Sequence, residues 1–516
     1  MNPIELNLFS SRLESICEQM GEVLRQAAFS PNIRDRLDYS CAIFDAAGKL
    51  SSQAAHIPVH LGSMAFALAD VVNSIDWQEG DQVIFNDPYL GGTHLPDVTM
   101  VAPVFHQQQL VAFVVNRAHH ADIGASTPGS MPVSSSLHEE GLVLAPVHYL
   151  QAGEYNQQVV EKLIDKLSST ESAGDFAAQV SANHFAVAAL QSLINKMDLD
   201  QYQAGLYALN DYAYKLSTRF LEKIPQGVYT FEDVMDDDGQ QNQAIKIRLT
   251  LTIRKKHIVA DFHGTAPQVA GNINCPLSVA AAAVYYVFRC LMPEQTPACA
   301  GAFEMITLKA PLGSLLNAQY PAAVAAGNVE TSTRIVDVVL GALGQAIPEL
   351  IPAASHGSMN NVSMGGVFEK AGTKNRWHYY ETIGGGMGAG EHGGGLSAVQ
   401  THMTNTLNTP VEVLETEYPL RVETYAVRVD SGGKGGRPGG NGLVRSFRFL
   451  APAHVSVLTE RRHVAPWGRQ GGEDGALGEN WLNGKLQLAK FQGSVNPGDL
   501  LQIHTPGGGG FGSIEK

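Results

Sequence analysis

Hydrophobic and polar positions alternate along the chain with two periods, one typical of helices and one typical of strands. From Pro3 to about Ala28, apolar residues recur every three or four positions, which predicts an amphipathic helix. The segments YSCAIFD and KLSSQAA flank an AAGK turn and are predicted to be strands, as is DQVIFND. Because a helical pattern over SMAFALADVVNSI lies between them, we expect strands and helices to mix in this part of the chain.

Later segments continue this mixture. The pattern is helical from Val159 to Lys223, with breaks expected near Gly174 and Asp198. The stretch 245–262 alternates on both sides of a charged turn, which predicts an antiparallel hairpin. Two further helices are expected, at about 277–292 and 330–347.

These patterns predict a mixed α/β (α+β) fold of several domains. The chain has 516 residues, enough for roughly three or four domains of ordinary size. We divide it into four regions: an N-terminal α/β region at 1–155, a helical connector at 156–224, a central α/β region at 225–410, and a glycine-rich, β-containing region at 411–516.

Glycine is concentrated in three late segments, IGGGMGAGEHGGG, DSGGKGGRPGGNG and TPGGGGFG. Such density either supplies tight turns and close backbone approach in irregular β structure, or forms a cradle for an anion. On the second alternative, Gly384, Gly385 and Gly386 are candidates for contact with a substrate or a transferred phosphate.

Composition and charge limit the possible functions. Hydrophobic residues make up 44% of the chain and charged residues 16%, as in a large folded protein. The net charge of −15, without a basic patch, argues against binding to nucleic acid or to an anionic membrane. Five scattered cysteines without a CxxC pair suggest neither a disulfide framework nor a cysteine zinc site. With no signal-peptide pattern and no apolar run long enough to span a bilayer, we expect a soluble cytoplasmic protein.

A second hairpin brings together the residues with the most distinctive chemistry. If VTMVAPVF and LVAFVVNR pair across the HQQQ turn, residues whose numbers sum to about 215 lie opposite each other. His119 at the end of the second strand then lies opposite Pro96, flanked by His94 and Asp97. Two imidazoles and a carboxylate with open coordination positions form the ligand set of a catalytic divalent metal: zinc, manganese or iron(II). The alternative is a set of ordinary polar residues at strand ends.

The neighbouring His120 is expected to have a different role. Adjacent residues of an extended chain point to opposite faces, so only one of His119 and His120 is expected to bind the metal, and the register favours His119. His120 or Asp122 would then act in proton transfer, or would hold a metal ligand in place without binding the metal itself.

Eight ordered motifs carry a family resemblance: RLDYSCAIFD, HIPVHLGSM, NDPYLGGTHLPDV, NRAHHADIG, EEGLVLAPV, ETIGGGMGA, HMTNTLNTPVEVLE and YPLRVETYAVRVDSGGKGGRPGGNG. Over nearly its whole length the chain resembles the hydantoinase B/oxoprolinase family. That family includes the B-type parts of 5-oxoprolinases and N-methylhydantoinases, lactamases acting on larger rings, and acetone and acetophenone carboxylases.

The resemblance implies a set of site residues. It assigns His94, Asp97 and His119 to one divalent metal ion, adds Asp38 of RLDYSC as a further ligand, and favours Glu140 as a catalytic residue. Two more histidines, His56 and His60, lie in HIPVH, where Pro58 argues against a metal pair on one helical face, so they are expected to line a substrate pocket or to pack.

The resemblance also implies a division of labour. A hydantoinase A-type partner with an ATPase fold would use ATP to phosphorylate the carbonyl oxygen of a cyclic amide, and this chain would process the activated species. The chain lacks a GxxxxGK[ST] motif, which agrees with ATP being used by the partner. We therefore expect the metal-bearing subunit of a hetero-oligomeric, ATP-dependent amidohydrolase acting on 5-oxoproline or a hydantoin-like ring. The alternatives are a subunit of an ATP-dependent ketone carboxylase and a non-catalytic scaffold for the ATPase.

Overall fold

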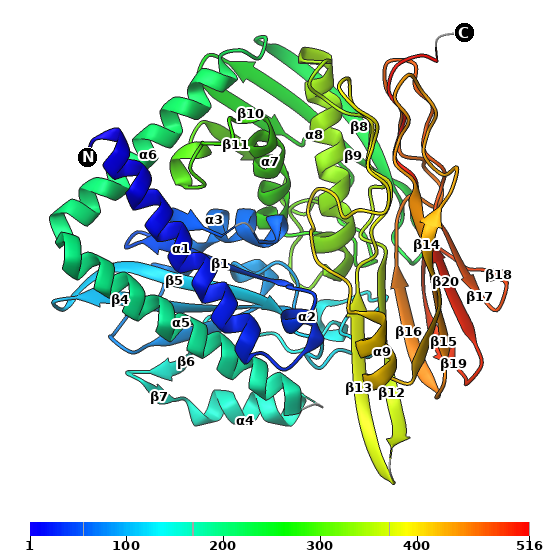
Figure 1. Cartoon of the computed structure of the whole chain (residues 1–516), viewed down its shortest axis with the longest axis horizontal. Coiled ribbons are helices and arrows are strands. Elements are labelled where there is room, and N and C mark those ends of the chain that lie inside the picture. The colour runs from blue at the N-terminus through cyan, green and yellow to red at the C-terminus, as the bar shows by residue number, and fades with distance from the viewer. Residues whose placement is uncertain (55, 168–169, 371, 515–516) are drawn as a thin grey trace.

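The fold is mixed α/β, as predicted, and the residues that the structure describes form four sheets (Figure 1). The computed structural model describes residues 1–54, 56–167, 170–370 and 372–514. Among these residues, no helix is both long enough and apolar enough to cross a bilayer.

The first sheet is antiparallel and has the strand order β2-β1-β5-β4-β3-β6-β7. Its strands are β1 (Tyr39–Asp45), β2 (Leu50–Gln53), β3 (Gln82–Phe85), β4 (Asp97–His106), β5 (Gln109–His119), β6 (Val147–Gln151) and β7 (Glu154–Tyr155). The helices of this part are α1 (Pro3–Ala27), α2 (Pro31–Arg34), α3 (Pro58–Val72), α4 (Gln157–Lys166), α5 (Thr170–Met197) and α6 (Leu199–Leu221).

Helices cover both faces of this sheet. Successive side chains of a strand point to opposite faces. In β1, Cys41 and Ile43 belong to the core shared with α1 and α5, whereas Ala42 and Phe44 pack with α3. Because both faces are covered, its central strands are almost continuously apolar, and a polar side chain at a strand end is held in a dry environment.

The predicted β4–β5 hairpin is present, but its predicted register is wrong by one residue at the far end. Near the turn, Phe105 pairs with Leu110, which agrees with the expected sum of 215. The register then shifts between Val104 and Phe105, so that Asp97, not Pro96, lies opposite His119. A β-bulge of this kind adds a residue to one strand, which a turn-based register cannot anticipate.

One of the two helix breaks predicted between 159 and 223 is confirmed. Asp198 separates α5 from α6 with a φ of 66° and caps α6 by accepting a hydrogen bond from the Gln201 amide. The other break lies earlier than expected: α4 ends at Lys166 and α5 begins at Thr170, so Gly174 lies inside α5. Glycine is needed there for packing, since a Cβ at that position would lie 2.3 Å from the ring of Phe29.

The second sheet has the order β11-β10-β9-β8 and contains the predicted hairpin. Its strands are β8 (Gly227–Asp237), β9 (Gln243–Arg254), β10 (His257–Asp261) and β11 (Ile306–Lys309). The two helices predicted here are confirmed as α7 (Leu277–Leu291) and α8 (Ser332–Ala346). One turn of π-helix, η4 (Gly327–Thr331), leads directly into α8.

Two further sheets form the C-terminal part of the chain, coloured yellow to red in Figure 1. One has the order β13-β12-β16-β19, with β12 (Asn361–Lys370), β13 (Thr373–Glu381), β16 (Ala453–Leu458) and β19 (Lys490–Val495). The other has the order β14-β15-β20-β17-β18, with β14 (Leu420–Arg428), β15 (Gly442–Phe449), β17 (Glu479–Leu482), β18 (Lys485–Leu486) and β20 (Leu500–His504). The short helix α9 (Val411–Glu417) packs on β14.

The three glycine-rich segments pack against one another through their backbones. The Gly440 amide donates a hydrogen bond to the Met387 carbonyl, and the Gly508 amide donates one to the Gly440 carbonyl. No glycine in 384–395 or 507–510 has a left-handed φ, so turn geometry does not explain them. A Cβ at Gly508 would lie 2.1 Å from the Met387 carbonyl oxygen. The glycines therefore permit close backbone contact, which supports the irregular-β alternative.

Candidate metal centre

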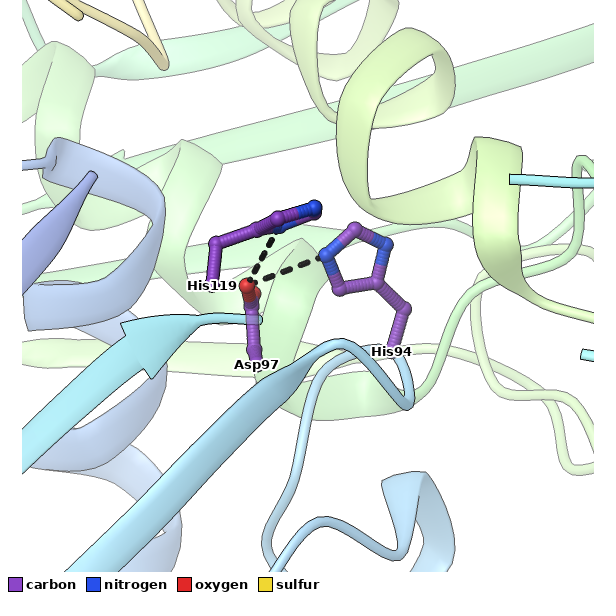
Figure 2. A group of neighbouring side chains, drawn as sticks. All are labelled: His94, Asp97 and His119. Atoms are coloured by element: carbon purple, nitrogen blue, oxygen red, sulfur yellow. Dashed lines mark hydrogen bonds and ion pairs between the residues drawn. The ribbon is translucent and has the colours of Figure 1, made fainter. Parts of the chain in front are cut away.

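The candidate metal centre lies where β4 begins and β5 ends. His94 belongs to the turn before β4, in which the Asp97 amide donates a hydrogen bond to the His94 carbonyl. Asp97 and His119 are paired across the hairpin, so their side chains point to the same face of the sheet. Figure 2 shows the rings of His94 and His119 turned toward one oxygen of Asp97.

The three side chains are close enough to share one cation. Asp97 Oδ1 lies 3.1 Å from His94 Nε2 and 3.1 Å from His119 Nδ1. One donor atom from each residue lies within 4.8 Å of the others, and all three residues are buried. His119 Nε2 is buried with no hydrogen-bond partner among the described residues, and the buried His94 Nε2 faces Asp97 Oδ1. Buried imidazole nitrogens beside a carboxylate fit a divalent cation that binds nitrogen and oxygen ligands.

The two oxygens of Asp97 have different surroundings. Oδ2 accepts hydrogen bonds from Thr93 Oγ1 at 2.8 Å and from Asn328 Nδ2 at 3.0 Å. His60 Nε2 lies 3.1 Å from the same oxygen. Oδ1 is left to face the two imidazoles. The sequence identified neither Thr93 nor Asn328, and it did not connect His60 with Asp97.

His94 is held by a chain of contacts that begins at Glu140. The Glu140 carboxylate accepts hydrogen bonds from Ser134 Oγ and from the amides of Val324 and Ala325. The Ala325 carbonyl in turn lies 3.2 Å from His94 Nδ1. Because a carbonyl only accepts, Nδ1 carries the hydrogen and Nε2 is directed at Asp97. This is the usual arrangement of a metal-binding histidine, whose other nitrogen donates to a carbonyl or carboxylate.

His119 is fixed by its backbone and by an aromatic ring from the C-terminal part. Its amide donates a hydrogen bond to the Asp38 carbonyl, and its ring stacks on Tyr380, with 4.5 Å between ring centroids. The Tyr380 hydroxyl donates to Asn361, and the Arg36 guanidinium carbon lies 4.9 Å from the centroid of the Tyr380 ring. The centre is therefore closed by residues of β12 and β13.

Electrostatic interactions favour a negative charge on Asp97. Burial alone would raise the pKa of its carboxyl, but His60, His94 and the hydrogen bond from His119 hold that pKa well below its ordinary value. At His94, burial is outweighed by Asp97, and the pKa of the imidazole is raised. Burial lowers the pKa of His119. Asp97 is thus an ionised carboxylate among buried imidazoles, as a cation site requires.

Of the other predicted site residues, Asp38 lies beside this centre, whereas the ring of His120 faces α5. Asp38 is adjacent: its Oδ1 lies 4.0 Å from His60 Nε2, but it stands outside the three-residue group defined above. Its role as a ligand stays a prediction. The His120 ring faces α5, stacks on Phe176 at 4.3 Å and lies 3.0 Å from Gln179 Oε1.

Asp122 and Glu140 are held by local contacts. Asp122 Oδ1 accepts a hydrogen bond from the Gly124 amide, and its Oδ2 lies 3.9 Å from His378 Nε2. Burial raises the pKa of Glu140 to about 7, although its hydrogen bonds to the 324–325 backbone and Ser134 act in the other direction. The contacts of Glu140 suggest a role in positioning His94.

The predicted substrate-binding residues are packed against other parts of the chain. His56 lies outside α3, accepts a hydrogen bond from the Cys41 amide, and meets Tyr39 edge-on. A Cβ at Gly385 would lie 2.4 Å from the His356 ring, and Gly384 lies similarly close to the backbone of Val399. Their contact with a substrate stays a prediction.

Comparisons with known proteins place this chain in a family. The family model for hydantoinase B/oxoprolinase matches residues 2–514. The chain belongs to the hydantoinase B/oxoprolinase family. The family resemblance predicted from the sequence motifs is confirmed.

Members of the hydantoinase B/oxoprolinase family include relatives of different length. A 5-oxoprolinase of Dictyostelium discoideum is 40% identical, and the match covers 100% of this chain but only 41% of that protein. The chain thus spans less than half of that relative. The putative B-type subunit of a D-/L-hydantoinase from a Pseudomonas species is 30% identical, and the match covers 99% of this chain and 90% of that protein.

Two solved structures have the same fold. The ATP-dependent caprolactamase from Pseudomonas jessenii superposes with a TM-score of 0.91 at 26% identity, covering 99% of this chain and 91% of that chain. A nucleotide-free acetone carboxylase superposes with a TM-score of 0.89 at 17% identity, covering 99% of this chain and 76% of that chain, and shows the fold alone.

Proposed function

We propose that this chain is the metal-bearing part of an ATP-dependent cyclic amidohydrolase of the 5-oxoprolinase or hydantoinase type. The observation that carries the proposal is the buried group of His94, Asp97 and His119, with Asp97 Oδ1 3.1 Å from a nitrogen of each ring. The family supports the reaction class, because its members include proteins named as a 5-oxoprolinase and as part of a hydantoinase. The substrate would be 5-oxoproline or a hydantoin-like ring.

The three donors, with Asp38 as a possible fourth, would hold one zinc, manganese or iron(II) ion. When bound, such a cation supplies Lewis acidity and lowers the pKa of water. The protein residues keep the donors in place: Glu140 orients His94 through the backbone of Ala325, and Tyr380 closes the face of His119. Their burial keeps bulk water from competing for the site.

Activation of the amide is assigned to a partner. An unstrained amide is a poor electrophile, and phosphorylation of its carbonyl oxygen would create both an attackable carbon and a leaving group. We infer that a hydantoinase A-type ATPase carries out this step, since the name of the Pseudomonas hydantoinase relative describes one subunit of a larger enzyme, and this sequence has no P-loop. His120 and Asp122 remain candidates for proton transfer.

The test is co-expression with an A-type ATPase partner, followed by measurement of ring opening and ATP consumption. The chain alone is expected to open no ring, and the pair is expected to couple ring opening to ATP hydrolysis. His94→Ala and His119→Ala should lose both the metal and coupled turnover while remaining folded. His120→Ala should retain its metal. Ring opening by the isolated chain without ATP would contradict the proposal.

The same preparation separates the two alternatives. A ketone carboxylase, whose fold is shared at a TM-score of 0.89, would consume its substrate only when bicarbonate is present. A scaffold for the ATPase would contain no stoichiometric metal, which elemental analysis of the purified protein would reveal.

A further inference from the structure

His60 joins the candidate metal centre from a different element. It lies in the first turn of α3, two residues after Pro58, and its side chain is buried. Its Nε2 lies 3.1 Å from Asp97 Oδ2, and its Nδ1 lies 3.3 Å from Ser40 Oγ. The ring therefore spans the space between β1 and the start of β4.

These contacts determine which nitrogen carries the hydrogen. A carboxylate oxygen accepts hydrogen bonds, so the 3.1 Å contact with Asp97 Oδ2 assigns the hydrogen to His60 Nε2. Ser40 Oγ accepts a hydrogen bond from the Ile57 amide at 3.2 Å, and its own hydroxyl is available to donate to His60 Nδ1. A continuous chain of donors thus runs from the Ile57 amide through Ser40 and His60 to Asp97 Oδ2.

We propose that His60 is a positioning residue that keeps Asp97 a one-oxygen ligand. This inference rests on the proposed function, because it concerns the metal held by that site. Together with Thr93 and Asn328, His60 saturates Oδ2 and so turns Oδ1 alone toward His94 and His119. Without His60, Oδ2 loses one of its three neighbours, and the carboxylate gains freedom to rotate or to bind through both oxygens.

The geometry distinguishes this role from that of a ligand. His94 and His119 face Asp97 Oδ1, whereas His60 faces Oδ2 through Nε2 and Ser40 Oγ through Nδ1, so both of its nitrogens are engaged. Residues that orient a ligand typically contribute about 10–100-fold to metal affinity, whereas loss of a ligand removes a bond to the metal. We therefore expect the loss of His60 to weaken metal binding without abolishing it.

The test measures zinc affinity by competition with a chelator, and coordination from the visible spectrum of the cobalt(II)-loaded protein. His60→Ala should bind zinc about 10–100-fold more weakly and should show an altered cobalt spectrum. His60→Gln places an amide nitrogen near the position of Nε2 and should restore both toward the values of the native protein. His60→Asn, whose amide is too short to reach Oδ2, should behave like His60→Ala.

His148→Ala is the matched control. His148 is a partly buried histidine of β6 whose Nε2 lies 3.3 Å from the buried carboxylate of Asp81, and it is not part of the metal group. This variant should leave zinc affinity and the cobalt spectrum unchanged.

Three other outcomes would contradict either this inference or the proposed function. Native-like zinc affinity in His60→Ala would overturn the inference, and so would complete loss of metal that His60→Gln does not rescue, because His60 would then be a ligand. Failure of the native protein to bind metal would instead overturn the proposed function.

Discussion

Gly386→Ala should separate the packing role of the glycine-rich segments from an anion-binding role. A Cβ at this position would lie 2.0 Å from the carbonyl oxygen of Gly440 and 2.3 Å from the amide nitrogen of Gly508. Both obstacles are backbone atoms, so no side-chain rotation relieves the contact. The two segments must move apart by about 1 Å or more to reach ordinary contact distance.

The free-energy cost of this movement includes the hydrogen bonds that it breaks. Gly386 donates a hydrogen bond to the Pro506 carbonyl at 3.0 Å, and Gly508 donates one to the Gly440 carbonyl at 2.9 Å. Overpacking a close-packed region costs about 1–3 kcal/mol, and the loss of two hydrogen bonds adds about 1–3 kcal/mol. We therefore expect the free energy of unfolding to fall by about 2–6 kcal/mol.

Urea unfolding monitored by tryptophan fluorescence is a suitable assay, because three of the four tryptophans lie in the C-terminal part, at 377, 467 and 481. Gly393→Ala is the control: it lies in the same glycine-rich segment, its φ is not left-handed, and nothing lies within 4 Å of its added Cβ. It should unfold at the same urea concentration as the native protein. A Gly386→Ala protein of native stability that loses ATP-coupled turnover would refute the packing argument and favour an anion cradle.

Three further perturbations test other parts of the structure. Glu140→Ala releases the backbone that holds His94 and should weaken zinc binding about 10-fold in a chelator competition, with Glu140→Gln less affected because it keeps an acceptor oxygen. Burial lowers the pKa of His356 to about 3, whereas the unfolded chain takes up a proton near pH 6.5. Stability should therefore be lost as pH falls from about 6.5 toward 3, by up to about 1.4 kcal/mol per pH unit, and urea midpoints of His356→Asn should fall less steeply with acid. Arg445→Met leaves the buried Glu381 carboxylate without its cation and should cost about 3–5 kcal/mol in urea unfolding, part of which the added Glu381→Gln should restore.

Local patterns predicted the elements well because the order of apolar and polar residues in a helix or strand depends mainly on that element itself. The first helix, the strands at YSCAIFD and KLSSQAA, and the hairpin at 245–262 all occur where periodicity placed them. Gly174 and the β4–β5 register were wrong for another reason: both depend on contacts that a local pattern does not contain. Phe29, far along the chain, requires glycine at 174, and a bulge near Val104 changes the pairing of every residue beyond it.

At the candidate centre, too, residues close together in the sequence could be predicted, whereas contacts from distant parts of the chain could not. One hairpin and the turn before it supply His94, Asp97 and His119, so the sequence could predict the donors even with the register one residue out. The bulge brings the two donors into register, since it makes Asp97 and His119 a directly opposed pair on one face of the sheet.

What the sequence could not predict is how those donors are held. Ala325 reaches His94, and Asn328 reaches Asp97, each from 231 residues away along the chain. Asn328 lies in η4, a turn of π-helix, which is a rare conformation frequently found at functional sites. This turn lies between Ala325 and α8, and the segment around it contacts two of the candidate donors, His94 and Asp97. The hairpin thus provides the chemistry of the centre, and the central and C-terminal parts of the chain fix its geometry.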